Sequence, residues 1–269
     1  MERGKLYIVG TPIGNLKDIT LRALETLKEV DLIACEDTRH TLGLLTHYEI
    51  KKPLISYYKP KEREGAERIL RNLSEGKNVA LVTDAGMPCI SDPGSILVKE
   101  AREAGYDVVS VPGATAVTTA MALSGILEPV FVFIGFLPSK KKEKTALLSQ
   151  YKDLKASIVF YCSPHDIKDD LKLFYEVLGA RKVSVIRELT KMYESVEEGT
   201  LGEFEIEEAR GEYVVIVQAS EKKEESKPEG SIEEQVDALI ASGVSKKDAI
   251  KQVAKQNGLP KDEVYKKFI

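Results

Sequence analysis

Hydrophobic positions follow two alternating patterns along the first part of the chain. Short apolar runs alternate with longer stretches in which apolar residues recur at helical spacing, as Leu21, Leu24 and Leu27 do within residues 20–30. The runs are typical of strands buried on both faces, and the stretches are typical of amphipathic helices. The alternation predicts an α/β domain over residues 1–112, with helices on both faces of one parallel sheet. Its strands are expected at residues 5–9, 31–34, 53–57, 78–83 and 107–111.

A second α/β domain is predicted over residues 113–220. Residues 200–206 are expected to add an antiparallel strand at the edge of its sheet. Two layered domains of this kind face each other across a cleft, where a ligand site is expected. The other predicted elements are apolar strands at residues 130–134, 157–161, 182–186 and 212–218 and a helix at residues 166–177.

The C-terminal region is predicted to form a separate helical module. Residues 221–230 contain no hydrophobic residue and are typical of a solvated linker. Beyond them, Ser231 and Ser245 are good helix N-caps, so residues 231–269 are expected to form a compact helix-turn-helix-like unit of three helices. Residues 244–269 hold seven Lys against three acidic residues, which suits a surface that faces phosphates. A solvated helical cap or a dimerisation arm would explain the same charges.

Net charge, apolar content and cysteine spacing exclude several classes of protein. A net charge of −4 over 269 residues argues against a protein that coats nucleic acid by its overall charge, but a local basic patch remains compatible with it. No apolar window approaches the roughly 18 residues needed to span a bilayer. The first residues show no signal-peptide pattern, so we expect a cytoplasmic protein with no membrane partner. Cys35, Cys89 and Cys162 are too scattered for a disulfide framework or a zinc site, and no metal is expected.

Three turns rich in small residues follow predicted strands, at residues 9–18, 84–88 and 111–116. Because parallel strands end at the same edge of a sheet, we expect these turns to outline one pocket for a flat, partly polar molecule such as an adenosine derivative. The first turn is neither a Gly-x-Gly-x-x-Gly nor a Gly-Lys-Ser/Thr loop, which disfavours nicotinamide and ATP. Ordinary strand-to-helix connections also carry Gly and Pro, so one turn alone does not indicate a ligand.

Charged residues are expected near the same edge, because Glu36, Asp37, Arg39 and His40 follow the second strand. Asp37 has a structural interpretation as a helix N-cap with Arg39 as its ion-pair partner. The functional interpretation uses Arg39 to hold a phosphate, and a carboxylate or His40 to orient a hydroxyl group.

The second domain carries comparable polar clusters. They lie at the strand ends of residues 163–166 and 187–191, and a basic loop follows at residues 139–144. The loop would line a groove for nucleic acid backbone or be ordinary solvated charge. The role of His165 stays open.

These segments occur together, in the same order, in a known family. The chain resembles the ribosomal RNA small subunit methyltransferase I family, among the tetrapyrrole-methylase-like S-adenosylmethionine enzymes. The resemblance implies two α/β domains of the tetrapyrrole methylase (class III methyltransferase) type, with S-adenosylmethionine between them. It also implies a homodimer that methylates the 2′ oxygen of a decoding-centre cytidine in 16S ribosomal RNA of the small ribosomal subunit, with an RNA-binding C-terminal module. The matching segments are residues 10–16, 18–24, 36–39, 84–86, 91–94, 111–113, 135–138, 163–165, 187–191 and 211–214.

The resemblance also implies roles for particular residues. Asp84 is expected to orient a polar part of the methyl donor, and Lys191 would act as a base only if its pKa were depressed. The residues expected to contact the donor are Pro12, Asp84, Gly86, Pro88, Thr115, Ala116 and Tyr161. The candidates for the base that takes the ribose proton, which spacing does not rank, are Glu36, Asp37, Glu188 and Lys191. The candidates for RNA contacts are Arg39, Arg187, Lys140, Lys141 and Lys142.

The chain departs from the family pattern at three positions. Met87 stands where Thr is usual, and Ala114 stands where Pro is frequent; both changes would reshape the donor pocket. Asp166 stands where an Arg often follows Ser-Pro-His, so no phosphate-binding role is carried over to it.

Two other functions remain compatible with the sequence. A tetrapyrrole (precorrin-type) methyltransferase would need a wide apolar trough and would leave the basic module unexplained. A non-catalytic RNA-binding factor in ribosome assembly would retain RNA without methyl turnover.

Overall fold

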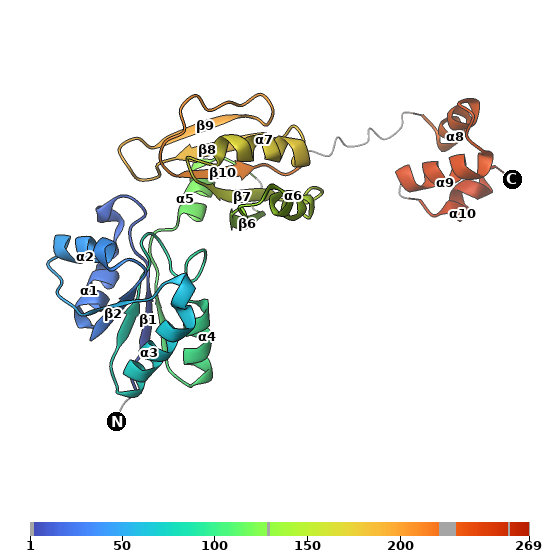
Figure 1. Ribbon diagram of the computed structural model, residues 1–269. Coiled ribbons are helices and arrows are strands. Elements are labelled where there is room, and N and C mark those ends of the chain that lie inside the picture. Colours follow the sequence, from blue (N-terminus) through green and yellow to red (C-terminus); the bar gives the residue numbers. More distant parts are fainter. Residues whose placement is uncertain (1–2, 128–129, 221–229, 258, 269) are drawn as a thin grey trace. The chain divides into compact units, whose positions relative to one another are not determined.

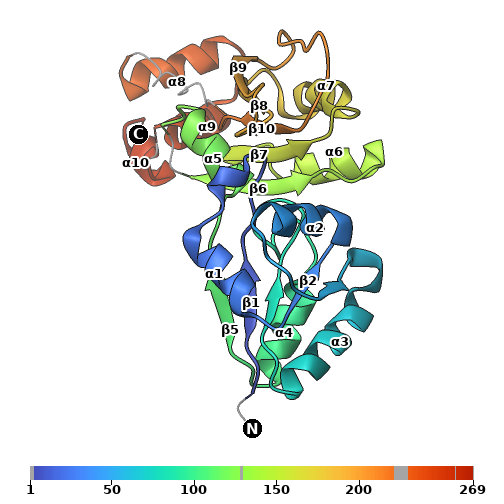
Figure 2. The same cartoon turned by 90° about the vertical axis from the view of Figure 1, so that its left-hand side faces the viewer.

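The computed structural model describes residues 3–127, 130–220, 230–257 and 259–268. The chain divides into two compact units, Met1–Ser220 and Glu221–Ile269 (Figure 1). The larger unit contains two separate five-stranded sheets, which Figure 2 shows from a second direction. The predicted linker lies almost wholly outside the described residues.

The first sheet is entirely parallel, as the apolar pattern predicted, and has the strand order β3-β2-β4-β1-β5. The central strands β2 and β4 are buried along their whole length, because helices pack on both faces. All five strands end at one edge, and the turns that follow β1, β4 and β5 build the site described below. The strands are β1 (Leu6–Val9), β2 (Leu32–Cys35), β3 (Leu54–Ser56), β4 (Val79–Leu81) and β5 (Val108–Val111).

Two hydrophobic clusters lie on opposite faces of this sheet. Leu73 of α3 and Leu97 of α4 belong to one cluster, and Leu27 of α1 and Leu45 of α2 belong to the other. The predicted apolar face of the first helix was partly wrong, because Leu21 is 79% exposed and α1 instead buries Ala23, Thr26 and Leu27. The helices are α1 (Leu21–Glu29), α2 (Thr38–His47), α3 (Glu62–Ser74) and α4 (Ser95–Glu103), with short 3-10 turns at Leu16–Asp18 and Lys59–Lys61.

The second sheet is mixed and has the order β6-β7-β10-β8-β9. Only β6 and β7 run parallel; β10 pairs antiparallel with β7 and β8, and β9 pairs antiparallel with β8. An antiparallel edge strand was predicted, but over the wrong residues: β9 covers 195–200, whereas Phe204 and Ile206 pack against the core from a loop. The elements are β6 (Phe131–Phe136), β7 (Ser157–Cys162), β8 (Lys182–Arg187), β9 (Ser195–Thr200), β10 (Tyr213–Val217), α5 (Ala116–Leu123), α6 (Lys141–Ser149) and α7 (Ile167–Leu178).

The smaller unit is a helical bundle with its own core. It comprises α8 (Ile232–Ala241), α9 (Lys246–Gln256) and α10 (Lys261–Lys266). Ser231 caps α8 in a reciprocal box with Glu234, and the Oγ of Ser245 accepts a hydrogen bond from the backbone N of Asp248 at 3.2 Å. The two predicted N-caps are therefore confirmed. In the described part of the chain, no helix has the length and apolar character to cross a membrane.

Candidate functional site

Three glycine turns meet at the carboxyl edge of the first sheet. A Cβ on Gly10 would lie 2.7 Å from the Cα and N of Gly113, so the first and third turns touch through their backbones. The backbone N of Thr11 donates to the carbonyl of Gly86 at 2.9 Å, which joins the first turn to the second. Gly86 has φ +82°, a conformation that favours glycine. The predicted convergence of the turns is confirmed.

A cavity of about 680 Å³ opens beside these turns and is bounded by both sheets. We name it the central cavity. Pro12 lines a neighbouring cavity instead, and Pro88 is buried and lines neither. The residues predicted to contact a donor that do line the central cavity are Asp84, Gly86, Thr115, Ala116 and Tyr161.

The central cavity is acidic. Glu36, Asp84, Asp92 and Glu212 line it, and no Lys, Arg or His among the described residues does. Burial raises the pKa of Glu36, and the charges of Asp92 and Asp84 raise it further. Burial also raises the pKa of Asp92, and the charge of Asp84 adds to this effect. Such a cavity favours a ligand that carries positive charge, because a cation relieves the repulsion between the carboxylates.

Aromatic and aliphatic side chains form another part of the wall. The ring of Tyr161 lies edge-on to Phe136, with 5.4 Å between centroids. Burial raises the pKa of Tyr161, so its hydroxyl stays neutral. Phe136 and Ile90 line the cavity yet are 62% and 65% exposed, which marks an open mouth where a flat group can enter. The cavity therefore combines carboxylates with an apolar wall.

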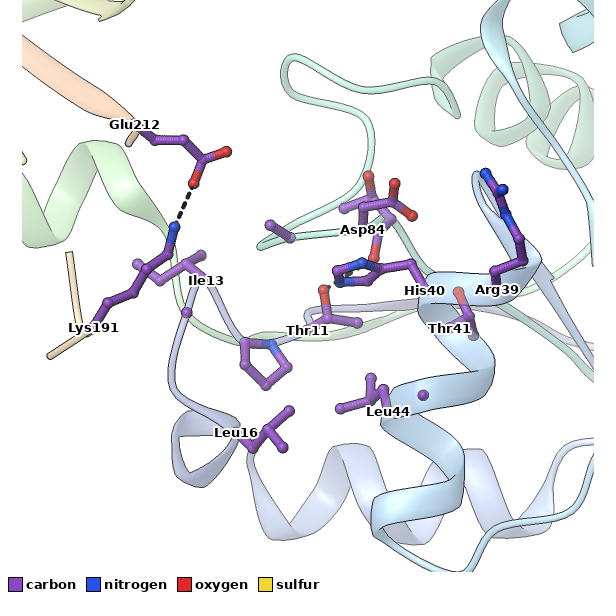
Figure 3. A pocket seen from close by; sticks show the side chains of 15 residues that line it. Thr11, Ile13, Leu16, Arg39, His40, Thr41, Leu44, Asp84, Lys191 and Glu212 are labelled. Carbon is purple, nitrogen blue, oxygen red and sulfur yellow. Dashed lines mark hydrogen bonds and ion pairs between the residues drawn. The ribbon is translucent and has the colours of Figure 1, made fainter. Parts of the chain in front are cut away.

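A second cavity, of about 770 Å³, adjoins the first. We name it the lateral cavity; it lies between the first turn and α2, and Figure 3 shows Leu16 and Leu44 on one side of it, Asp84 on another and the Lys191–Glu212 pair at one end. The lining residues that the two cavities share are Ile13, Asp84, Ala85 and Glu212.

The base candidates Glu36 and Asp37 are adjacent in the chain but differ in their surroundings. Asp37 caps α2 by accepting a hydrogen bond from the backbone N of Arg39 at 2.8 Å, and its Oδ2 lies 2.7 Å from Nη2 of Arg39. Hydrogen bonds from Arg39 lower the pKa of Asp37 to about 2, and Asp37 lines neither cavity. The structural interpretation of Asp37 is therefore confirmed. Glu36 lines the central cavity, and its Oε2 accepts a hydrogen bond from Thr83 at 3.3 Å.

The base candidates Glu188 and Lys191 belong to one ion-pair network. The Nζ of Lys191 lies 2.9 Å from a carboxylate oxygen of Glu188 and 2.9 Å from one of Glu212. Burial lowers the pKa of Lys191, but these carboxylates outweigh it and the net pKa is raised. The depressed pKa that a lysine base needs is therefore not found here. Burial raises the pKa of Glu188, but the hydrogen bond from Lys191 and the charge of Lys191 outweigh this effect, so the net pKa is lowered. Glu188 lines neither cavity.

The loop that carries Glu188 and Lys191 packs against the first of the three glycine turns. Glu188 and Thr190 have positive φ angles of 50° and 65°, which are strained for residues other than glycine. A Cβ on Gly14 would meet the Cγ of Lys191 at 2.6 Å. The close approach of Gly14 thus lets the second domain's loop close one end of the lateral cavity.

The residues predicted to contact RNA do not line one cavity. Arg39 lines the lateral cavity, with its side chain 89% exposed, whereas Arg187 is partly buried at the end of β8 and lines neither cavity. Lys140, Lys141 and Lys142 lie at the start of α6, exposed and outside both cavities. Lys140 pairs with Glu143 and Lys141 pairs with Glu176.

Asp166, the third departure from the family pattern, has a local structural role. Its Oδ2 accepts a hydrogen bond from the Oγ of Ser163 at 2.6 Å, at the start of α7. Its Oδ1 lies 3.8 Å from the buried Lys144 ammonium, which also binds Asp170. Neighbouring His165 is exposed and lines neither cavity.

The fold matches a known class of enzyme. The family model described as Tetrapyrrole (Corrin/Porphyrin) Methylases matches residues 5–205, from β1 through β9. A solved structure of uroporphyrin-III C-methyl transferase from Thermus thermophilus, complexed with S-adenyl homocysteine, aligns with a TM-score of 0.57 at 20% identity. The alignment covers 80% of this chain and 97% of that chain. The chain has the two-sheet fold of the tetrapyrrole methylases, which are class III methyltransferases.

Curated relatives narrow this class. A protein from Halalkalibacterium halodurans named Ribosomal RNA small subunit methyltransferase I is 46% identical over an alignment of 275 positions, which covers 98% of this chain and 94% of that protein. A Thermotoga maritima protein with the same name is 47% identical over an alignment of 222 positions, which covers 81% of this chain and 100% of that protein. The chain belongs to the ribosomal RNA small subunit methyltransferase I family.

Proposed function

We propose that the protein transfers a methyl group from S-adenosylmethionine to the 2′ oxygen of a decoding-centre cytidine in 16S ribosomal RNA. Membership of the family makes it an S-adenosylmethionine-dependent methyltransferase that acts on ribosomal RNA. The observation that carries the site assignment is the acidic central cavity at the three interlocked turns. Family membership does not by itself specify the methylated nucleotide or the 2′ position, and both are part of the proposal.

The residues of the central cavity fit the donor. S-adenosylmethionine has a flat adenosine part and a positively charged sulfur, and the cavity offers an apolar wall at Tyr161 and Phe136 together with carboxylates at Asp84 and Asp92. Thr115 is the N-cap of α5 and Ala116 is its first residue, so their backbone N–H groups have no partner within the helix. These groups would hold the donor by polar contacts at its ends and by burial of its ring.

Glu36 is the base candidate that the geometry supports best. When bound, S-adenosylmethionine supplies a methyl carbon attached to a sulfonium sulfur. A lone pair of the ribose oxygen forms the new C–O bond, the C–S bond breaks with its electrons retained by sulfur, and the hydroxyl proton passes to a base. Glu36 lines the same cavity, and its raised pKa makes its carboxylate a better proton acceptor than an ordinary one. Most of the remaining acceleration comes from alignment of oxygen and methyl carbon.

The helical module is proposed to add RNA affinity. Its exposed Lys residues include Lys247, Lys251 and Lys261, which lie on α9 and α10. The whole Thermotoga maritima relative aligns with 81% of this chain, a share close to the larger unit, Met1–Ser220. This supports placing donor binding and catalysis in the larger unit.

A homodimer in the cytoplasm is part of the proposal. Exposed apolar side chains gather between the end of α5 and the edge strand β6: Leu123 at 44%, Leu127 at 93% and Val130 at 59%. Exposed apolar residues beside an edge strand favour contact with another chain. We expect Leu127→Glu to shift the protein toward monomers in sedimentation analysis, while the exposed control Lys28→Glu should leave the mass unchanged.

The experiment that tests the function is mass spectrometry of ribosomal RNA nucleosides. Unmodified small subunits are incubated with the protein and S-adenosylmethionine, and we expect one new 2′-O-methylcytidine in the decoding centre. Methylation at another nucleotide would refute the finer assignment but keep the enzyme class. RNA retention without methylation would support an assembly factor instead. Transfer to a precorrin, and none to RNA, would support a tetrapyrrole methyltransferase.

A further inference from the structure

The lateral cavity has the size and position of an acceptor site. Its volume of about 770 Å³ lies within the range of roughly 300–1,000 Å³ typical of small-ligand sites. Asp84 and Ala85 line both cavities, so a group bound in the lateral cavity lies next to one bound in the central cavity. Methyl transfer needs donor and acceptor atoms at van der Waals contact, and adjoining cavities allow this contact.

We propose that the lateral cavity receives the acceptor nucleotide, extruded from the RNA, and that Gly43 of α2 keeps this cavity open. The inference rests on the proposed function and deepens it. Extrusion of a nucleotide costs a few kcal/mol of stacking, which contacts inside a pocket repay.

The lining matches the parts of a nucleotide. Leu16 and Leu44 provide an apolar surface for the faces of a base (Figure 3), and Pro12 also lines the cavity. Asp84 and His40 supply polar groups for base edges and ribose hydroxyls. Arg39 binds Asp37 through Nε and Nη2, which leaves further N–H groups for a phosphate outside the cavity. The cavity therefore offers apolar and polar contacts, and Arg39 offers a cationic contact for a phosphate outside it.

The stability of the fold does not explain why residue 43 is a glycine. A glycine inside a helix costs about 1 kcal/mol relative to alanine. A Cβ on Gly43 would meet no described atom within 4 Å apart from its chain neighbours and the backbone of its own helix, and Gly43 is not among the glycines with positive φ. Every other glycine that the structure describes has a positive φ or a close contact at its Cβ position. Neither backbone conformation nor packing requires glycine here, so the open space in front of it is the remaining reason.

The first test fills the cavity from α2. Gly43→Leu is compared with Gly43→Ala and with Thr46→Leu, an exposed position on the same helix that lines neither cavity. We expect Gly43→Leu to keep its melting temperature and its affinity for S-adenosylhomocysteine within twofold, but to lose at least tenfold in kcat/KM on small subunits. Gly43→Ala should lie between Gly43→Leu and wild type, and Thr46→Leu should match wild type.

Two outcomes would overturn the inference. A Gly43→Leu enzyme with wild-type kcat/KM would show that the acceptor binds elsewhere. Loss of donor affinity in this variant would assign the lateral cavity to the donor. The proposed function is tested separately, because it fails only if the wild-type enzyme leaves the ribose unmethylated.

A reversible block within one protein makes the test independent of folding. Gly43→Cys treated with a methanethiosulfonate reagent should lose activity on small subunits and regain it when dithiothreitol reduces the mixed disulfide. Wild type is the matched control: Cys35 and Cys162 are buried, and burial raises the pKa of Cys89 to about 11, which disfavours the reactive thiolate. Full activity of the modified Gly43→Cys protein would overturn the inference.

Discussion

The contact between the first and third turns predicts a large effect of Gly10→Ala. The added Cβ would lie 2.7 Å from the Cα and N of Gly113 and 2.7 Å from the Sδ of Met87. Carbon atoms in ordinary contact are about 3.5–4.0 Å apart, so the overlap is roughly 1 Å. The thioether can move, but the chain before Gly113 is held beside Gly10, since the backbone N of Gly10 donates to the carbonyl of Val111, at the end of β5, at 3.0 Å.

The magnitude follows from the cost of overpacking. Forcing extra atoms into a packed region costs about 1–3 kcal/mol, and we expect the upper end because backbone must shift. For a unit of this size, ~3 kcal/mol corresponds to a fall of roughly 6–12 °C in melting temperature. Displacement of the third turn should also weaken binding of S-adenosylhomocysteine at least tenfold, or about 1.4 kcal/mol.

Calorimetry measures both the melting temperature and the affinity for S-adenosylhomocysteine. Two further variants identify the cause of the changes in Gly10→Ala. Gly43→Ala is the matched control, because its Cβ meets nothing within 4 Å and helix propensity should stabilise it by up to about 1 kcal/mol. Adding Met87→Ala to Gly10→Ala should restore little, because the backbone clash remains. A Gly10→Ala protein that melts within 1 °C of wild type and binds the donor product normally would refute the reasoning.

Four further predictions follow from the site. Asp84→Ala should weaken donor binding at least tenfold in calorimetry, and undiminished affinity would place the donor elsewhere. Glu36→Gln should lower kcat by about 10²–10⁴-fold at unchanged donor affinity, and a full rate in single-turnover assays would assign the proton to another group. The raised pKa of Asp92 means that the native state binds its proton more tightly than the unfolded state does. Ionised Asp92 therefore lowers the stability of the fold above its native pKa, and this loss disappears below the ordinary pKa of 3.8. Asp92→Asn should therefore raise the melting temperature at pH 7 by a margin that shrinks toward pH 4, and a margin that grows toward pH 4 would contradict this sign. A chain ending at Ser220 should keep its melting temperature and donor affinity but bind small subunits more weakly, with a smaller salt dependence; equal affinity in filter binding would remove the module from RNA recognition.

The fold was predictable because its signals are local. Apolar runs and glycine-bearing turns identified the parallel sheet and the edge at which Gly10, Gly86 and Gly113 meet. The edge strand β9 was misplaced because Phe204 and Ile206 look like strand residues, yet they contribute to the core from a loop. Hydrophobicity reports burial and does not by itself report strand pairing.

The site was predictable only in part. Position after a strand locates Glu36 and Asp37 at the sheet edge, but it does not show that one lines a cavity while the other caps α2. Lys191 pairs with Glu188, three residues before it, which raises its pKa, but its second partner, Glu212, is distant in sequence and has no local signal. Asp92 was part of a matched segment and was given no role, whereas it lines the central cavity.

The backbone contacts among the three turns also limit how the enzyme can be re-engineered. The positions that shape the turns beside the central cavity are glycines in mutual contact. Side-chain libraries at Gly10 or Gly113 would therefore mostly yield misfolded protein. Room for a bulkier synthetic cosubstrate would have to come from the exposed mouth, where Ile90 and Phe136 can be shortened without touching the turns. Selection for altered alkyl transfer should therefore enrich changes at these two positions first.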